Sequence, residues 1–235
     1  MNNTLANGLT LLAFLSGTAE AYSVTELAQH LDLPKSHVHR LLQTLVGMGY
    51  CLQDEDRRYR IGLEPLVISK ALLAHHPLRQ VARVHLHRVA EATGLDTLIA
   101  IPHRASTALV LGVAYPGGEQ RDAATAIGNL LRFPTTASCT LFAVVIPGFA
   151  DASVFADDVR ADIAARDQAL KDPANASEVN GLTTAIRDAD GQVVACLGIS
   201  GPRTAFADDL DRLRAIQAEA AAAIATAYTA RSASA

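Results

Sequence analysis

The chain has 235 residues, of which 50% are hydrophobic and 19% are charged, and its formal net charge is -4. This length allows one large domain or two modest ones, and the composition suits a packed core and excludes wholesale disorder. The acidic total excludes a generally basic nucleic-acid binder, although a few cations can still gather on one surface. Aromatic residues are scarce, which argues against stacking platforms for single-stranded nucleic acid.

The cysteines and the N-terminal sequence point to a cytoplasmic protein. Cys51, Cys139 and Cys196 lie far apart and form no C-x-x-C pair, a pattern typical of free thiols in a reducing compartment. The first residues lack a basic stretch followed by an apolar one, so no signal peptide is predicted. Since no apolar run approaches the length of a membrane span, no membrane partner is expected.

The first 63 residues are predicted to form three helices and a hairpin. An apolar stripe between Leu5 and Leu15 has roughly helical spacing and marks the first helix. The second helix opens at Ser23, because Glu26 three residues later completes a capping box. A short turn follows, and Pro34 suits the first turn of a third helix.

The third helix, about Lys35 to Met48, has one apolar side and one polar side. The apolar side carries Val38, Leu41, Leu42, Leu45, Val46 and Met48. The polar side carries Ser36, Arg40, Gln43 and Gly47, with His37 and Thr44 on one edge and His39 on the other. Such a helix packs on a core and presents short polar groups and one arginine to a partner.

A hairpin with a charged tip is predicted after the third helix, which ends at Gly49. Its strands are Tyr50–Gln53 and Arg58–Ile61. Because side chains alternate along a strand, one pair should point outward and the other inward. The outward pair is Arg58 and Arg60, and the inward pair is Tyr59 and Ile61.

The remaining residues indicate an α+β fold. Residues 64–76 are apolar and lack a Gly/Ser run, so a connecting helix is expected there, with a domain boundary at 75–77. Helices are then predicted near Leu78–Ala92, from Ser138 to before Pro147, and at the C-terminus. Strands are predicted near Thr97–Ile101, Ala108–Val113, Leu182–Arg187 and Gln192–Ser200. Strands and helices mixed without a βαβ rhythm are typical of α+β domains.

Two short helices joined by a tight turn, the second with a polar front, form a helix-turn-helix unit that fits the DNA major groove. Arg40 can bond guanine, Gln43 can bond adenine, and Ser36 suits either a base or a phosphate. Lys35 and the arginines of the hairpin would contact phosphates. The candidate DNA-binding residues are Lys35, Ser36, His37, His39, Arg40, Gln43, Arg57, Arg58 and Arg60. The alternative is a small helical interaction module with a solvated polar face.

The motifs closely resemble those of the isocitrate-lyase-regulator (IclR) family of bacterial transcription regulators. The matching segments are T-E-L-A from Thr25, L-P-K-S-H-V-H-R-L-L from Leu33, G-Y at Gly49, and Y-R-I-G from Tyr59. The segments Leu78-Arg-Gln-Val-Ala-Arg, Ala92-Thr-Gly, Gly191-Gln-Val-Val-Ala and Ile199-Ser-Gly-Pro resemble parts of the family's second domain. The resemblance is strong over about residues 4–94 and 178–202.

The resemblance implies a winged helix-turn-helix at 1–63, a linker helix at 64–77 and a GAF-like effector-binding domain at 78–235. It also implies binding of double-stranded operator DNA by a homodimer, which in the family often pairs into a dimer of dimers. The expected function is that of a repressor whose operator affinity is controlled by a small effector, an organic or aromatic acid from a catabolic pathway. His37 stands where the family usually has threonine, so a relative's operator sequence cannot be transferred.

The effector is expected near the run Thr135–Thr140, because a helix N-terminus binds carboxylates through free amides and the helix dipole. The candidate effector-binding residues are Thr135, Thr136, Ser138, Cys139, Thr184, Gly198 and Ser200. Relatives usually have Gly-Lys where this chain has Ser138-Cys139. The segment from Gly181 to Asp188 is about three residues shorter than usual. In the alternative interpretation, these hydroxyls only cap a helix.

Other chemistries have weaker support. Cys139 near a helix start could be a nucleophile, but no histidine base is placed beside it. The sequence Gly198-Ile-Ser-Gly departs from the G-x-S-x-G hydrolase motif. His85 and His87 are two apart on a helix and face differently, which disfavours a metal site. No enzyme activity, metal or cofactor is therefore expected, although a metabolite-processing enzyme and a DNA-binding protein without an effector remain as alternatives.

Overall fold

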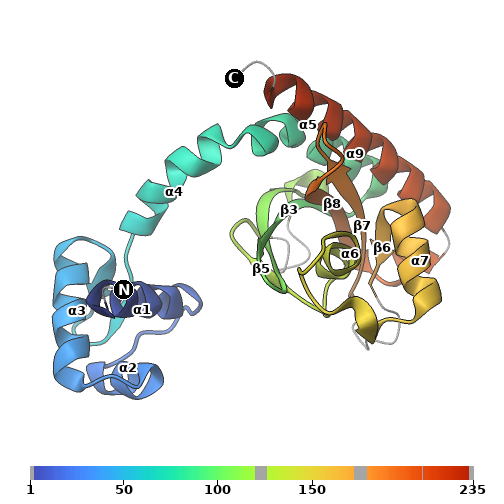
Figure 1. Cartoon of the computed structure of the whole chain (residues 1–235). Coiled ribbons are helices and arrows are strands. Elements are labelled where there is room, and N and C mark those ends of the chain that lie inside the picture. Colours follow the sequence, from blue (N-terminus) through green and yellow to red (C-terminus); the bar gives the residue numbers. More distant parts are fainter. Residues whose placement is uncertain (1–2, 120–125, 172–178, 208, 233–235) are drawn as a thin grey trace. The chain divides into compact units, whose positions relative to one another are not determined.

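The computed structural model describes residues 3–119, 126–171, 179–207 and 209–232. The chain divides into two compact units, Met1–Ala74 and His75–Ala235. Figure 1 shows both units, with most of the helices and several strands labelled. Mixed helices and antiparallel strands confirm the predicted α+β class. Among the described residues, no helix is both long enough and apolar enough to cross a membrane.

The first unit contains three helices, a two-stranded hairpin and a further helix. These are α1 (Asn3–Ser16), α2 (Val24–Leu31), α3 (Lys35–Gly47), β1 (Cys51–Gln53), β2 (Tyr59–Ile61) and α4 (Glu64–His75). One residue or more from each of the first three helices is fully buried in the core, including Leu11, Leu27 and Leu42. The apolar stripes that the sequence predicts therefore meet in one small core, which leaves the polar side of α3 at the surface.

The start of α2 has the predicted capping box. The Ser23 hydroxyl accepts a hydrogen bond from the Glu26 backbone N–H (3.3 Å), and the Glu26 carboxylate accepts one from the Ser23 N–H (2.7 Å). Helix α2 ends at Leu31, and its C-cap residue Asp32 adopts a left-handed conformation with φ 51°. Helix α3 then begins directly after Pro34 and ends at Gly47, one residue before the predicted end.

The hairpin is joined to the helices by close backbone contacts. Strands β1 and β2 are antiparallel, with Leu52 opposite Arg60. Tyr22 adds an isolated bridge to Tyr59 through two backbone hydrogen bonds of 2.9 and 2.7 Å. At Gly62, an added Cβ would lie 2.2 Å from the Gly49 carbonyl oxygen. Position 62 therefore requires glycine, since no side chain fits against that backbone.

The second unit is built on a six-stranded antiparallel sheet in the order β5-β4-β3-β8-β7-β6. The strands are β3 (Asp96–Arg104), β4 (Thr107–Ala114), β5 (Leu130–Arg132), β6 (Gln168–Leu170), β7 (Val179–Arg187) and β8 (Val193–Pro202). The helices are α5 (Pro77–Thr93), α6 (Ala137–Val145), α7 (Asp157–Arg166), α8 (Thr204–Ala207) and α9 (Leu210–Ser232), with short 3-10 turns η1 (Pro116–Gly118) and η3 (Ala152–Val154).

Helices cover both faces of this sheet, so the unit has two apolar layers. Helices α5 and α9 pack together on one face, and α6 packs on the other (Figure 1). Along β3, Ile99 belongs to the first layer, whereas Leu98 and Ala100 belong to the second. This alternation follows from the period of two along a strand, and it decides which side chains reach the α6 side.

Candidate DNA-binding surface and effector pocket

The polar side of α3 is exposed, and its apolar side is buried. Val38, Leu41 and Leu42 lie in the core, whereas Arg40 and Gln43 are exposed. Lys35, Ser36 and His39 are exposed as well, and His37 is half-buried. The division matches the predicted one, because a helix on a core buries every third or fourth residue. Arg40 therefore lies on a surface that is available to a partner.

His37 connects α1 to the exposed arginine of α3. Its Nε2 lies 3.2 Å from the Asn7 amide nitrogen, and its Nδ1 lies 3.5 Å from an Arg40 guanidinium nitrogen. This imidazole therefore lies between a side chain of α1 and a side chain of α3. His37 therefore contacts the predicted base-reading arginine itself.

A groove of about 760 Å³, lined by polar and apolar residues, lies between α3 and the hairpin. It brings together the predicted residues His39 and Gln43 of α3 and Arg57 of the hairpin tip, and it adds Gln53 of β1. Gln53 was not predicted, because its side chain belongs to a three-residue strand whose alternation cannot be read without its partner strand. An amide at that position can donate to and accept from a base edge.

The hairpin cations differ in their contacts. Arg57 adopts a left-handed conformation at the tip (φ 59°), and Arg60 is exposed on β2. The side chains of Lys35, Arg57 and Arg60 make no hydrogen bond or ion pair to the residues that the structure describes. These three cations are therefore available for phosphate oxygens.

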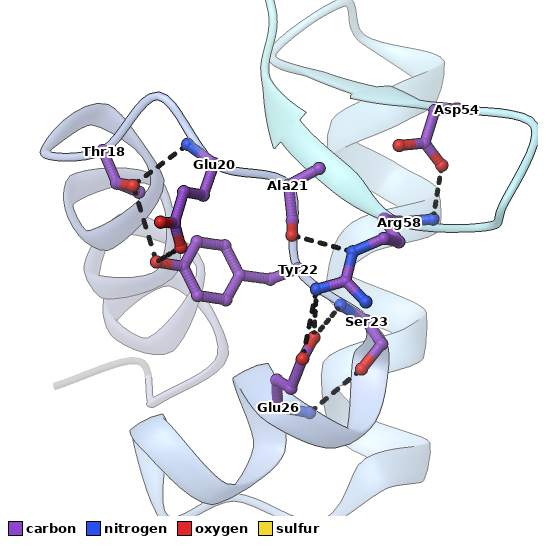
Figure 2. A network of polar contacts seen from close by, with 8 residues as sticks. All are labelled: Thr18, Glu20, Ala21, Tyr22, Ser23, Glu26, Asp54 and Arg58. Atoms are coloured by element: carbon purple, nitrogen blue, oxygen red, sulfur yellow. Dashed lines mark hydrogen bonds and ion pairs between the residues drawn. The ribbon is translucent and has the colours of Figure 1, made fainter.

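Arg58 departs from the expectation that it points outward to DNA. Its guanidinium turns back onto the protein, donating from Nε to the Ala21 carbonyl oxygen (2.9 Å) and from Nη2 to both Glu26 carboxylate oxygens (3.1 and 2.9 Å), as Figure 2 shows. The alternation along β2 predicts the burial of Tyr59 correctly. It does not predict the direction of a long arginine side chain, because the guanidinium turns to any carboxylate within its reach.

The same contacts lower the pKa of Glu26 below its usual value. The Ser23 backbone N–H contributes most, followed by the Ser23 hydroxyl and then by the Arg58 guanidinium. The Ser23 N–H and the Arg58 guanidinium donate hydrogen bonds to the carboxylate, and the Ser23 hydroxyl lies beside it, so all three groups favour the ionised form. The ionised carboxylate of Glu26 at the start of α2 is thus already bound by the Ser23 N–H and by the Arg58 guanidinium.

A cavity of about 90 Å³ opens on the α6 side of the second unit. It is lined by residues of β3, β5, β7 and β8 and by the start of α6, namely Leu98, Leu131, Thr135, Thr136, Ala137, Ser138, Lys171, Asn180, Gly181, Leu182, Thr183, Gly198, Ile199 and Ser200. Five of the predicted effector residues line it: Thr135, Thr136, Ser138, Gly198 and Ser200. The structure therefore brings together residues that lie far apart in the sequence.

Two predicted effector residues lie outside the cavity lining. Thr184 is buried and donates to Gln217 of α9 (2.9 Å), because it points to the opposite face of β7 from Thr183. Cys139 is fully buried, and its Sγ donates to the Leu131 carbonyl oxygen (3.3 Å). The sequence analysis therefore chose the wrong one of two neighbouring threonines: Thr183 lines the cavity, and Thr184 faces the other side of the sheet.

The cavity also contains residues that the sequence did not reveal. Lys171 supplies a cation, and Asn180 and Thr183 supply further polar groups. Lys171 follows β6 and donates its backbone N–H to the Gly181 carbonyl oxygen (2.7 Å). A three-residue strand gives no periodic signal, so the position of this lysine beside β7 could not be predicted.

The hydroxyls at the start of α6 have separate roles. Thr136 caps the helix, since its hydroxyl accepts a hydrogen bond from the Cys139 N–H (3.4 Å), and Thr135 donates to the Arg132 carbonyl oxygen (2.8 Å). The capping alternative therefore applies to Thr136. Ser138 is only 4% exposed and lines the cavity.

The alternative chemistries find no support in the described parts of the chain. All three cysteines are buried, and burial raises the pKa of Cys51 and of Cys196 to about 11 and raises that of Cys139 as well. Such thiols are protonated and poor nucleophiles near neutral pH. Among the described residues, no group of three or more His, Cys, Asp or Glu side chains could hold a metal ion.

Comparison with known proteins agrees with these motifs. The family model for the IclR helix-turn-helix domain matches residues 4–55. The HTH-type transcriptional repressor AllR of Salmonella typhimurium strain LT2 is 25% identical over 226 residues, which covers 87% of this chain and 82% of the relative. This relative is a regulator.

Solved structures show the same fold. The IclR family transcriptional regulator from Brucella abortus superposes with a TM-score of 0.81 at 22% identity, covering 97% of this chain and 92% of that one. An IclR homologue from Microbacterium hydrocarbonoxydans, solved as a complex with 4-hydroxybenzoate, has a TM-score of 0.76 at 20% identity and covers 97% and 99%.

Proposed function

We propose that the chain is a DNA-binding transcription regulator of the IclR family, and that it is a repressor whose operator affinity is set by a small carboxylate effector. One observation carries the DNA-binding part of this proposal. Helix α3 buries its apolar side and exposes Arg40 and Gln43, the two side chains best suited to bidentate base contacts. The proposed regions are residues 1–63 for DNA binding, 64–77 for linkage and 78–235 for effector binding.

The proposed contacts fall into two groups. Ser36, His39, Arg40 and Gln43 would face base edges, and Gln53 would join them from the other side of the groove. Lys35, Arg57 and Arg60 would contact phosphates, which hold the protein on the duplex without reading its sequence. His37 would act beside Arg40, since it lies 3.5 Å from that guanidinium. Arg58 is left out of both groups, because its guanidinium is bound to Glu26.

A homodimer is proposed because the first unit exposes apolar side chains on α1 and α4. Leu5 and Leu9 of α1 and Leu66 and Ile68 of α4 are each more than half exposed, at 62, 57, 68 and 58%. An apolar groove of about 510 Å³ lies beside them, lined by residues of α1, α3 and α4. Exposed apolar surfaces of this kind are typical of contacts between protein chains.

The cavity beside α6 is the proposed effector site. Backbone amides at the start of α6, the Ser138 hydroxyl and Lys171 would together hold a carboxylate. A cavity of about 150 Å³ is known to hold benzene, so the 90 Å³ available here favours a small aliphatic acid over an aromatic one. The homologue with 4-hydroxybenzoate supports an acid-type ligand as a class.

The DNA-binding part is tested by selecting duplexes from a random-sequence pool with the wild-type protein and then measuring the affinity of variants. Arg40→Ala should lose about 1–3 kcal/mol of specific binding while the fold remains intact. Arg104→Ala, an exposed arginine at the end of β3 in the second unit, is the matched control and should bind as the wild type does. Equal affinity of the Arg40→Ala protein would refute the assignment.

The effector part is tested by thermal-shift measurements with aliphatic monocarboxylates and with 4-hydroxybenzoate. A ligand that binds only the folded state at 100 times its Kd stabilises it by about 2.7 kcal/mol. We expect a shift with short aliphatic acids and a smaller one with the aromatic acid. If no acid shifts the transition, the interpretation as a DNA-binding protein without an effector replaces this part of the proposal.

A further inference from the structure

We propose that Arg58 is a positioning residue that fastens the hairpin to the start of α2, and that it does not contact DNA. In this role it sets where Arg57 and Arg60 lie relative to α3. The inference rests on the proposed DNA binding, because it assigns the work of one hairpin cation within that surface. It replaces the expectation that all three hairpin arginines contact phosphates.

The guanidinium of Arg58 donates hydrogen bonds to two different partners. Nε donates to the Ala21 carbonyl oxygen at 2.9 Å, and Nη2 donates to both Glu26 carboxylate oxygens at 3.1 and 2.9 Å (Figure 2). The Arg58 backbone N–H also donates to the Asp54 carboxylate at 2.7 Å, which closes the hairpin turn. The side chain therefore links the hairpin to the segment before α2 and to α2 itself.

The carboxylate that receives Arg58 is itself held in place. Glu26 lies in the first turn of α2, where it accepts the Ser23 N–H at 2.7 Å as part of the capping box. One oxygen of this carboxylate thus accepts from both the helix cap and the hairpin. The ion pair consequently joins the hairpin to a carboxylate that the cap of α2 already holds.

The contacts of Arg58 with Ala21 and Glu26 form a joint between the hairpin and the start of α2. A second contact lies beside this joint and limits how the hairpin can turn. Tyr22 and Tyr59 exchange two backbone hydrogen bonds, so the residues flanking Ala21 and Arg58 form a short antiparallel pair. The Tyr59 side chain is 4% exposed and packs in the core. With the backbone pair on one side and the guanidinium on the other, β2 has little freedom to rotate about its own axis.

This joint bears on DNA binding because the two other arginines of the hairpin, which make no ion pair to the described residues, are next to it. Arg57 precedes Arg58 at the tip, and Arg60 lies two residues after it on β2. A rotation of β2 would move both guanidinium groups with respect to α3. By contrast, the charge of Arg58 is compensated by Glu26 at 2.9 Å, so it would release few counterions from DNA.

The opposite interpretation is that Arg58 leaves Glu26 and binds a phosphate once DNA is present. The two interpretations predict opposite signs for Glu26→Gln. If Arg58 contacts DNA, removing the carboxylate frees the arginine and deletes a negative charge near the phosphates, so binding tightens. If Arg58 fastens the hairpin, the variant loses the ion pair and one of the two oxygens that accept from Arg58, and binding weakens. The Glu26→Gln variant would keep the capping box, because a glutamine side chain at that position still accepts from the N-cap N–H.

The experiment measures Kd by fluorescence anisotropy over a series of salt concentrations, with full-length protein and a duplex that the wild type selects from a random pool. The variants are Arg58→Ala and Glu26→Gln, with Arg60→Ala as the matched control. Arg58→Ala and Glu26→Gln should each weaken binding about three- to tenfold at every salt concentration, with the slope of log K against log salt unchanged. Arg60→Ala should flatten that slope by about 0.9.

Two further readouts decide the proposal. The double variant Arg58→Ala/Glu26→Gln should bind about as weakly as either single variant, since both remove the same joint. In the DNA-free protein, amide hydrogen exchange over residues 51–61 should be faster in both single variants than in Arg60→Ala. A flatter salt slope for Arg58→Ala, tighter binding by Glu26→Gln, or unchanged exchange would overturn the proposal. If the wild type selects no duplex, the proposed function fails. The exchange result then still shows whether Arg58 and Glu26 fasten the hairpin to α2.

Discussion

The close backbone approach at Gly62 supports a quantitative prediction of stability. An alanine Cβ there would lie 2.2 Å from the Gly49 carbonyl oxygen, 2.8 Å from the Tyr50 carbonyl carbon and 3.0 Å from the Cys51 nitrogen. All three atoms belong to the backbone that leads into β1, so no side-chain rotation relieves the contact. The Gly62 N–H also donates to the Tyr50 carbonyl oxygen at 2.7 Å, and this bond lengthens if the strands separate.

Overpacking in a tight site costs about 1–3 kcal/mol, and contact with immovable backbone places Gly62→Ala at the upper end of this range, about 3 kcal/mol. For a unit of this size, each kcal/mol lowers the Tm by about 4–8 °C, which gives a decrease of about 12–24 °C for the transition of the first unit. The measurement is differential scanning calorimetry of the full chain, with hydrogen exchange over residues 3–74 to assign the transition.

The matched control is the same substitution at a position with free space. Gly47, the last residue of α3, has nothing within 4 Å of an added Cβ, so Gly47→Ala should stabilise the first unit by about 0.5–1 kcal/mol through helix propensity. Opposite signs for the two variants would support the steric argument. A Tm for Gly62→Ala within about 2 °C of the wild type would refute it.

Three other predictions concern single residues. Ser138→Leu should fill the cavity beside α6, so that operator binding persists without a response to the acid; calorimetric titration at wild-type affinity would place the ligand elsewhere. Because its hydrogen bonds lower the pKa of Glu26, the stabilisation from the ionised form is present above the unfolded value and is lost as the pH falls through the lower folded value. The protection factors of the amides over residues 51–61, which are exchange rates corrected for the intrinsic rate at each pH, should therefore fall below about pH 4.5, and Glu26→Gln should reduce that dependence. Phe142→Ala, at a fully buried α6 position, should cost about 3–5 kcal/mol in urea unfolding, and a loss below about 1 kcal/mol would contradict the packing described.

The sequence predicts local structure well where one physical signal dominates. The capping box at Ser23 and Glu26 and the two-sided pattern of α3 each involve residues within one or two helical turns, and the structure confirms both. Strands β5 and β6 were not predicted, because three residues are too few for a periodic pattern. Helix α7 was not predicted either, since it buries only Ile163 and so lacks an apolar stripe.

The candidate sites were predictable only as far as their contacts are local. Arg40 and Gln43 lie on the predicted surface, because helical geometry alone decides which side of α3 they occupy. The direction of Arg58 depends on a carboxylate 32 residues away, and the place of Lys171 depends on the pairing of β6 with β7. Such long-range pairings follow from the assembled fold and are not encoded in spacing along the chain.

The burial of the cysteines has a practical consequence for measuring these effects. Cys51, Cys139 and Cys196 are all in the core, and their raised pKa values keep them protonated at neutral pH. Maleimide reagents attack the thiolate, so the native thiols should react slowly in the folded protein. A cysteine introduced at exposed Glu55 in the hairpin tip would then carry a fluorophore selectively, without removal of any native cysteine. The regulator would in this way report the position of its own hairpin while it binds DNA.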